Sequence, residues 1–206
     1  MDNECFEFRD EISEKLVDLD DQKKTIFSLL ICKRLFPNYV FFSKKYEYGD
    51  PSKLETIIST LFRDVLENNK TLKIDNYINI VENITPDTQD YDTILASFAL
   101  DACTSILSTL YFLKDGDFEN LVDVATYARD TVDMFIQERD DLDINDIQMD
   151  QLIEEDPFMQ RELKRQFEVV DYLTNIKSES LSIIDLSSLR ELAKDDIIDI
   201  SLLRNV

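Results

Sequence analysis

Apolar residues recur every three to four positions along most of the chain, which is the period of an amphipathic α-helix. Residues 7–19 and 22–36 are amphipathic in this way, and residues 118–138 divide into an apolar face and an acidic face. The segment 92–113 is apolar almost all round, which is typical of a helix surrounded by other helices. The pattern predicts an all-α fold, in which residues 1–206 form a single compact multi-helix domain around the central apolar helix at about 92–113.

Capping and breaking residues separate these segments. Gly49-Asp50-Pro51 combines a glycine that closes one helix with a cap and a proline that open the next, so a helix is expected from here to about Glu67. Asp156-Pro157 repeats the cap and the proline before a helix to about Ile176. Asp115-Gly116-Asp117 predicts a tight turn between two long helices.

Two further prolines predict helix boundaries. Pro37 is expected to end the helix of residues 22–36, and Asn38 is expected to cap a short aromatic helix through Tyr46. Thr85-Pro86 is expected to open the central segment in the same way.

The composition agrees with a helical fold. The chain has 206 residues, of which 44% are hydrophobic, and only 2 are Gly and 4 are Pro. Sheet proteins and loop-rich enzymes need more turn residues than that. The absence of histidine excludes serine–histidine triads, Cys–His dyads and histidine general bases. No catalytic residue, cofactor or metal site is predicted, and any metal would have to rest on carboxylates alone.

The cysteines and the start of the chain indicate a compartment. Cys5, Cys32 and Cys103 form no close pair, and each is expected to be a small buried hydrophobic residue in a reducing environment. The start Met1-Asp2-Asn3-Glu4 lacks both the basic and the apolar part of a signal peptide. The longest apolar run, Ile94–Leu113, contains an acidic residue and is not expected to span a bilayer. The prediction is a cytoplasmic protein without a membrane partner.

The negative charge is concentrated in the middle of the chain. Of the net charge of −22, residues 81–160 hold −17, from 3 basic and 20 acidic side chains. One interpretation is a solvated face that keeps the protein soluble. The other is an acidic surface that steers a basic protein partner. Direct nucleic-acid binding is not expected, because phosphates would be repelled and no basic stripe with aromatic residues is present.

Some runs in the chain resemble ligand sites without completing them. Residues 141–152 begin like a calcium loop, but Asp146 stands where the loop needs Gly, and Leu152 stands where it needs a bidentate Glu. The acids between residues 87 and 92 are expected to complement the dipole of the central helix. The aromatic residues of 36–48 predict a hydrophobic mini-core.

Asp101 is the only charged residue between Asp92 and Lys114. It belongs to a narrow stripe of hydroxyl side chains, which either meets solvent or faces another helix. If the stripe faces a helix, Asp101 needs a partner, because a buried unpaired carboxylate is strongly destabilising. Arg34 is the expected partner, since it follows an apolar stripe and can fork two hydrogen bonds onto a carboxylate.

Four groups of residues, in this order, carry a family resemblance: Cys32-Lys33-Arg34-Leu35-Phe36-Pro37-Asn38-Tyr39, Tyr48-Gly49-Asp50, Pro86 with Asp90-Tyr91-Asp92, and Asp101-Ala102-Cys103. With the helix after Pro157, they resemble the bacterial YjaG family, a domain of unknown function, to about residue 180. The resemblance implies a compact all-helical fold and a bacterial cytoplasmic setting. It implies no activity.

The chain departs from that family at Phe62, where a Trp is usual, at Phe98, where a Pro is usual, and in the tail from about Ser180. The shared motifs and the hypothesis of an Arg34–Asp101 pair together define one candidate structural or ligand cluster, which consists of Arg34, Asn38, Tyr39, Asp50 and Asp101.

Three classes of function remain open. The favoured one is a non-enzymatic cytoplasmic binding or assembly protein that uses the acidic surface of residues 81–160 on a basic protein. The second is a small-molecule or carboxylate-metal enzyme, and the third is an acidic immunity-type inhibitor of a basic protein. The tail of residues 180–206 is more apolar than a lone terminal helix needs, so it is expected to dock on the core or on a second subunit of a homodimer.

Overall fold

The computed structural model describes residues 3–67, 73–143, 145–176, 181 and 183–203, with side chains from Glu7 onward except those of residues 183–184. Within this part of the chain the regular elements are all helical. They are α1 (Asn3–Val17), α2 (Asp21–Tyr46), α3 (Pro51–Leu66), α4 (Ile74–Ile84), α5 (Ile94–Asp115), α6 (Glu119–Asp140), α7 (Met149–Glu155), α8 (Pro157–Asn175) and α9 (Ile183–Leu192), with short 3-10 turns η1 (Thr88–Asp90) and η2 (Ile200–Leu202).

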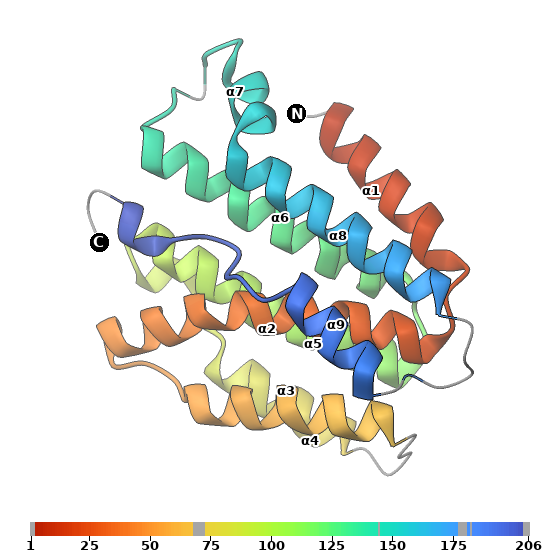
Figure 1. Ribbon diagram of the computed structural model, residues 1–206. Coiled ribbons are helices and arrows are strands. Elements are labelled where there is room, and N and C mark those ends of the chain that lie inside the picture. Colours follow the sequence, from red (N-terminus) through yellow and green to blue (C-terminus); the bar gives the residue numbers. More distant parts are fainter. Residues whose placement is uncertain (1–2, 68–72, 144, 177–180, 182, 204–206) are drawn as a thin grey trace.

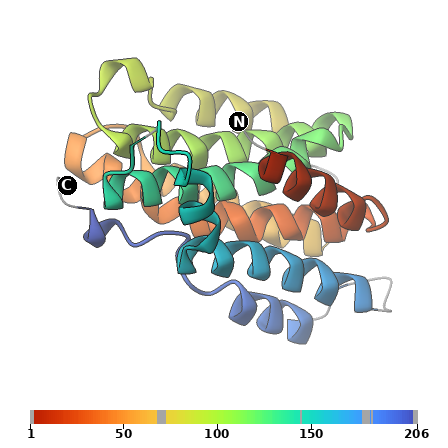
Figure 2. The same cartoon turned by 90° about the horizontal axis from the view of Figure 1, so that it is seen from above.

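Two long helices, α2 and α5, lie side by side through the middle of the molecule, and α6 packs against both (Figures 1 and 2). Helix α3 covers α2, α4 covers α5, and α1 and α8 cover α6. Large side chains that are fully shielded from solvent fill the centre, among them Leu35, Phe98 and Phe135. The prediction of a compact all-α domain around the helix near residues 92–113 is confirmed, and α2 shares that central position.

Local sequence signals set several helix boundaries as predicted. The Asp50 carboxylate accepts a hydrogen bond from the Lys53 amide at 3.3 Å and caps α3. The Asp156 carboxylate accepts from the Phe158 amide at 2.7 Å and caps α8. Gly116 closes α5 with a φ of 74°, a left-handed conformation that favours glycine.

Two predicted boundaries are wrong. Helix α2 continues through Pro37 to Tyr46, so Asn38 lies inside the helix and caps nothing. The proline removes one helical hydrogen bond, to the carbonyl of Lys33, and Lys33 is an exposed residue. Thr85-Pro86 follows the end of α4 and does not open the central helix, which begins at Ile94 behind a Thr93 cap. In α2, burial of Tyr39 and Phe42 beyond Pro37 outweighs the local signal.

By length and composition alone, α2 and α5 are long and apolar enough to cross a membrane. Their most apolar windows are 72% and 61% buried inside the protein. Packing against neighbouring helices accounts for this apolarity, as it does for the core helix of a compact domain.

The tail docks on the same core as the rest of the chain. Helix α9 packs against α8, and the segment after it runs on toward the end of α2 (Figure 1). Apolar side chains from both parts join the core, namely Leu186, Leu189, Ala193, Ile197, Ile198 and Leu203. These six apolar side chains of the tail are therefore buried against the core of their own chain.

Candidate functional site

Arg34 does not pair with Asp101, so the predicted ion pair is wrong. The guanidinium of Arg34, on α2, forks onto both carboxylate oxygens of Glu162, on α8, and its Nη1 donates to Oε1 at 3.1 Å. Arg34 is 4% exposed and Glu162 is fully buried. The bidentate geometry that Arg34 was expected to use is present, but on a carboxylate from the other half of the chain.

Further polar groups complete this buried pair. Gln166 donates to Glu162 Oε1 at 2.9 Å and to the carbonyl of Ala125, on α6, at 3.1 Å. Arg34 Nε donates to the carbonyl of Asp195 at 3.2 Å, and Arg165 donates to the Asp195 carboxylate at 2.8 Å. The network therefore ties α2, α6 and α8 to the chain segment that follows α9.

The sequence carries a signal for Glu162 and Gln166 that the prediction missed. Both residues fall on the buried stripe of α8, at helical spacing with Met159, Val169 and Leu173. Polar residues that interrupt an apolar stripe need partners, because burial without one is costly. The polar residues in the apolar stripe could have been recognised from the sequence. The helix that supplies their partner could not.

Tyr39 and Asp50 do come together, at the turn between α2 and α3. The Tyr39 hydroxyl donates to the carbonyl of Ile84 at 2.9 Å and accepts from the Asp50 amide at 3.2 Å. Gly49 has a φ of 71°, and a Cβ atom added there would lie 1.9 Å from the Tyr39 hydroxyl oxygen. Burial raises the pKa of the Tyr39 hydroxyl, which remains a neutral donor. These shared motif residues thus hold two helices and a turn together.

Asp101 lies apart from the other candidates, between α5 and α6. Its carboxylate accepts a hydrogen bond of 2.7 Å from the buried hydroxyl of Thr131. The polar stripe therefore faces another helix, and its acid is partnered by a hydroxyl group rather than a cation. Burial, assisted by the nearby Asp130, raises the pKa of Asp101 to about 7 against the opposing effect of the Thr131 hydrogen bond.

Asn38 lies one turn after Arg34 on α2 and is 2% exposed. Its side-chain nitrogen has no hydrogen-bond partner among the described residues. It lines a cavity of about 590 Å³ together with residues of α8 and of the segment 195–201. The five predicted residues thus fall into three places: the Arg34–Asn38 turn of α2, the Tyr39–Asp50 contact, and Asp101.

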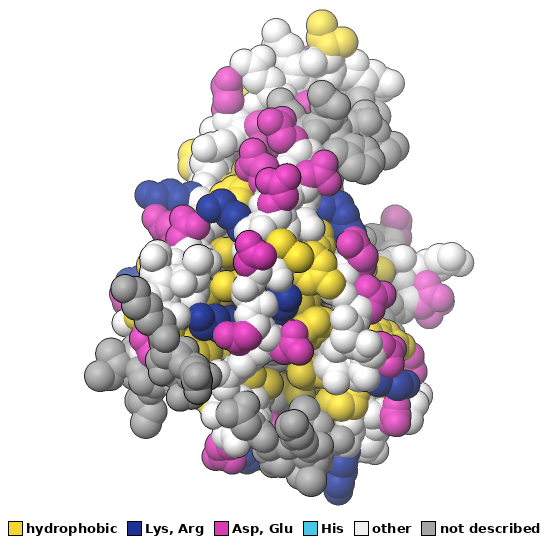
Figure 3. All heavy atoms as spheres, turned by 90° about the vertical axis from the view of Figure 1, so that its right-hand side faces the viewer, with side chains coloured by type: hydrophobic (Ala, Val, Ile, Leu, Met, Phe, Trp, Pro, Cys, Tyr) yellow, Lys and Arg dark blue, Asp and Glu magenta, His cyan; other side chains and the backbone are white. Residues whose placement is uncertain are grey.

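The basic residues of 81–160 are all engaged with carboxylates. Arg129 contacts Glu154 at 2.6 Å, Arg139 contacts Asp156 at 2.6 Å, and Lys114 contacts Asp75 at 2.9 Å. Figure 3 shows one face of the molecule, on which acidic side chains lie among basic and apolar ones. A group of exposed acids that these cations do not contact lies after α6, between residues 141 and 155.

The cysteines and acidic runs offer no further chemistry in the described structure. Cys32 and Cys103 are buried free thiols, as predicted, while the side chain of Cys5 lies outside the described residues. Burial raises the pKa of both thiols to about 12, so neither is a reactive thiolate. Among the described residues, no three Cys, Asp or Glu side chains gather in a way that could hold a metal ion.

Comparison with known proteins gives a consistent result. The uncharacterized protein YjaG of Salmonella typhimurium is 22% identical to this chain over 186 residues, which cover 89% of the chain and 93% of that protein. YjaG of Escherichia coli K12 shows the same identity and coverage. An uncharacterized protein of Haemophilus influenzae is 22% identical over 178 residues, covering 85% of the chain and 89% of that protein.

A solved structure shares the fold. The crystal structure of a DUF416 family protein from Shewanella baltica matches with a TM-score of 0.78 at 24% identity, over 88% of this chain and 92% of that chain. The family model described as "Protein of unknown function (DUF416)" matches residues 11–200. The resemblance to YjaG is thereby confirmed, and the chain belongs to the DUF416 family, whose function is unknown.

Proposed function

We propose that this protein is a non-enzymatic cytoplasmic binding protein that captures a basic segment of another protein on its acidic surface. The observation that carries the proposal is the stretch 140–156, which holds eight acidic residues and no Lys or Arg. The acids of residues 141, 143, 146, 150 and 155 are exposed. Like charges held close together attract a basic partner and speed its association.

Two exposed apolar side chains within this stretch support a protein partner rather than simple solvation. Ile147 is 98% exposed and Leu152 is 47% exposed. Charge alone gives a solvated surface, whereas apolar side chains among the charges add area that a partner can bury. A basic segment with apolar residues would match both features.

The proposal is tested with a fluorescent peptide of alternating Lys and Leu, titrated at low and high salt and followed by anisotropy. Replacing Asp141, Asp143, Asp146 and Asp150 with Asn should weaken binding about tenfold at low salt, because each exposed charge contributes a few tenths of a kcal/mol. High salt should remove most of the difference.

A matched control removes the same charge elsewhere. Asp10, Glu11 and Glu14 on α1, and Asp18 directly after it, are exposed, and their conversion to Asn and Gln leaves the stretch 140–156 intact. This control should bind as the parent does. Equal weakening by both variants would show that only the net charge of the protein matters, and it would contradict the proposal. A peptide that does not bind at all would contradict it too.

The apolar contribution has its own control. Ile147→Ser should weaken peptide binding at both salt concentrations, because burial of apolar area is not screened by ions. Val17→Ser, which changes a residue that is 52% exposed on α1, should have no effect. If the two changes act alike, Ile147 is only an exposed loop residue.

A further inference from the structure

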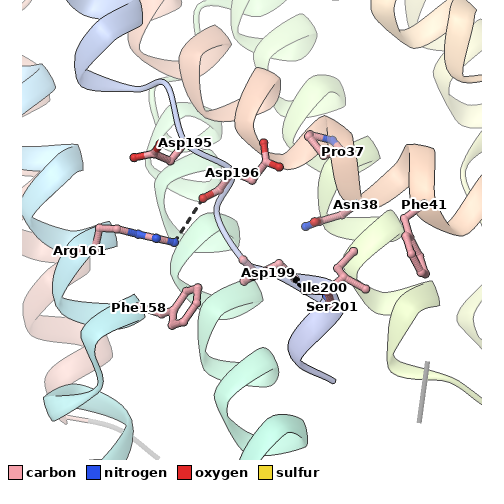
Figure 4. A pocket seen from close by; sticks show the side chains of 11 residues that line it. Pro37, Asn38, Phe41, Phe158, Arg161, Asp195, Asp196, Asp199, Ile200 and Ser201 are labelled. Carbon is pink, nitrogen blue, oxygen red and sulfur yellow. Dashed lines mark hydrogen bonds between the residues drawn. The ribbon is translucent and has the colours of Figure 1, made fainter. Parts of the chain in front are cut away.

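A cavity of about 590 Å³ lies between α2, α8 and the chain segment 195–201. Figure 4 shows that side chains from these three parts point toward one space, although the third part is more than a hundred residues from the first in sequence. This volume falls within the range of pockets that hold small organic ligands, about 300–1,000 Å³. The surrounding chain is held in place by the Arg34–Glu162 network.

The inner wall of the cavity carries hydrogen-bond donors without acceptors. The Asn38 amide nitrogen, on a side chain that is 2% exposed, has no partner in the part of the chain that the structure describes, and Figure 4 shows this amide directed from α2 toward the segment 195–201. Arg161 Nε is also buried without a partner in these described segments, while the Arg161 Nη2 donates to the carbonyl of Ile197 at 2.9 Å. Buried donors are nearly always satisfied, so these two point to an acceptor oxygen on a ligand.

The outer wall carries excess negative charge. Asp195 is neutralised by Arg165 at 2.8 Å, whereas the Asp196 carboxylate has no hydrogen-bond or ion-pair partner among the described residues. Within the described segments, the Asp199 carboxylate accepts from Ser201 alone, from its hydroxyl at 2.6 Å and its amide at 3.1 Å. Of the described residues that line the cavity, Arg161 is the one cation. A ligand that pairs with Asp196 and Asp199 would therefore be positively charged.

Two aromatic rings border the same space. Phe41 is 38% exposed, which is unusual for so large an apolar side chain. The guanidinium carbon of Arg161 lies 4.6 Å from the centroid of the Phe158 ring. Aromatic faces bind both the apolar stem and the charged end of organic cations. Their position beside the carboxylates is suited to such a group.

We infer that this cavity binds a small organic cation that also carries a carbonyl oxygen, such as an amino-acid amide. The carbonyl oxygen accepts from Asn38 and Arg161, the cationic end pairs with Asp196 and Asp199, and the stem lies against Phe41. The site shares no residue with the acidic stretch 140–156, so it does not depend on the proposed protein partner.

The test is a titration of the folded full-length protein with three defined probes, followed by ¹⁵N correlation spectra in which the Asn38 side-chain NH₂ is assigned. Argininamide supplies both groups, agmatine supplies cations without a carbonyl, and N-acetylglycinate supplies acceptors without a cation. Argininamide should shift the Asn38 signals and bind about tenfold more tightly than agmatine, the effect of one added hydrogen bond. N-acetylglycinate should not bind.

Substitutions in the cavity show which residues bind the carbonyl group of the ligand and which bind its cationic group. Asn38→Ala should remove the preference for argininamide over agmatine, while the double change Asp196→Asn and Asp199→Asn should weaken both cations. Asn76→Ala and the double change Asp90→Asn and Asp92→Asn alter exposed residues outside the cavity lining and should change nothing. Asp196 and Asp199 are themselves exposed, so their substitution should leave the fold intact. The double variant therefore still tests the inference if Asn38→Ala impairs folding.

The inference is overturned if none of the probes moves the Asn38 signals up to millimolar concentration. It is equally overturned if argininamide binds the Asp196 and Asp199 double variant as tightly as the parent. Neither result bears on the peptide titration of the acidic stretch, so this inference and the proposed function can fail separately.

Discussion

Arg34 and Glu162, which are 128 residues apart in the chain, form a buried bidentate ion pair that joins α2 to α8. The pair is completed by Gln166 and by the carbonyl of Asp195, so both ions have additional hydrogen-bond partners. Burying two charges is unfavourable unless such partners are present. The network is a structural junction that also positions the wall of the cavity around Asn38.

Removing Glu162 is expected to be strongly destabilising. Glu162→Ala would leave the Arg34 charge buried and unpaired, which lowers the free energy of unfolding by about 3–5 kcal/mol. Glu168→Ala alters an exposed acid of the same helix and should stay within about 0.5 kcal/mol. Urea denaturation of the two variants measures both values, and similar midpoints would show that the pair contributes little.

Asp101 is expected to make stability depend on pH. Burial raises its pKa from 3.8 to about 7, so the folded protein binds this proton more tightly than the unfolded chain does. The stabilisation that Asp101 contributes to the folded state is therefore fully present below pH 3.8, and it is lost as the pH rises from 3.8 to about 7. Asp101→Asn should flatten the fall in unfolding free energy between these values, whereas Asp92→Asn, at an exposed acid, should leave it unchanged. Parallel profiles for the parent and Asp101→Asn would contradict the assignment.

Gly49 and Gly116 allow the cost of backbone strain to be measured separately from the cost of a side-chain clash. Both have a positive φ, 71° and 74°, but a Cβ at Gly116 meets nothing within 4 Å, while one at Gly49 meets Tyr39. Gly116→Ala should lower the unfolding free energy by about 1–2 kcal/mol through backbone strain alone. Gly49→Ala should cost about 1–3 kcal/mol more, because the Tyr39 ring must shift. Thermal melts of the pair give the difference, and equal losses would rule out the Tyr39 contact.

The tail is expected to stabilise the core of its own chain. Leu189→Ala removes a fully buried side chain and should lower the unfolding free energy by about 2–5 kcal/mol. Leu202→Ala changes a residue that is 47% exposed and should have little effect, within about 0.5 kcal/mol. Denaturation at several protein concentrations checks this. A loss for Leu189→Ala that disappears at low concentration would place its contact on a second subunit instead.

Features that depend on neighbouring residues could be predicted from the sequence. The helical period, the caps at Asp50 and Asp156, and the glycine turn at Gly116 each act over a few residues, so their residues alone determine them. The absence of histidine and the position of the acidic residues also follow directly from the sequence. Membership of the family could be recognised because short motifs around Tyr39 and Asp101 recur in a given order.

Features that depend on contacts across the chain were decided by the tertiary structure. Pro37 lies inside α2 because burial of Tyr39 and Phe42 beyond it outweighs one lost helical hydrogen bond. Arg34 selects Glu162 rather than Asp101 because the packing of α8, not spacing along the chain, sets which carboxylate it reaches. The cavity at Asn38 exists only where the segment 195–201 folds back over α2, so no local pattern could predict it. The sequence determines which side chains need partners, and the packing of helices determines which partners they receive.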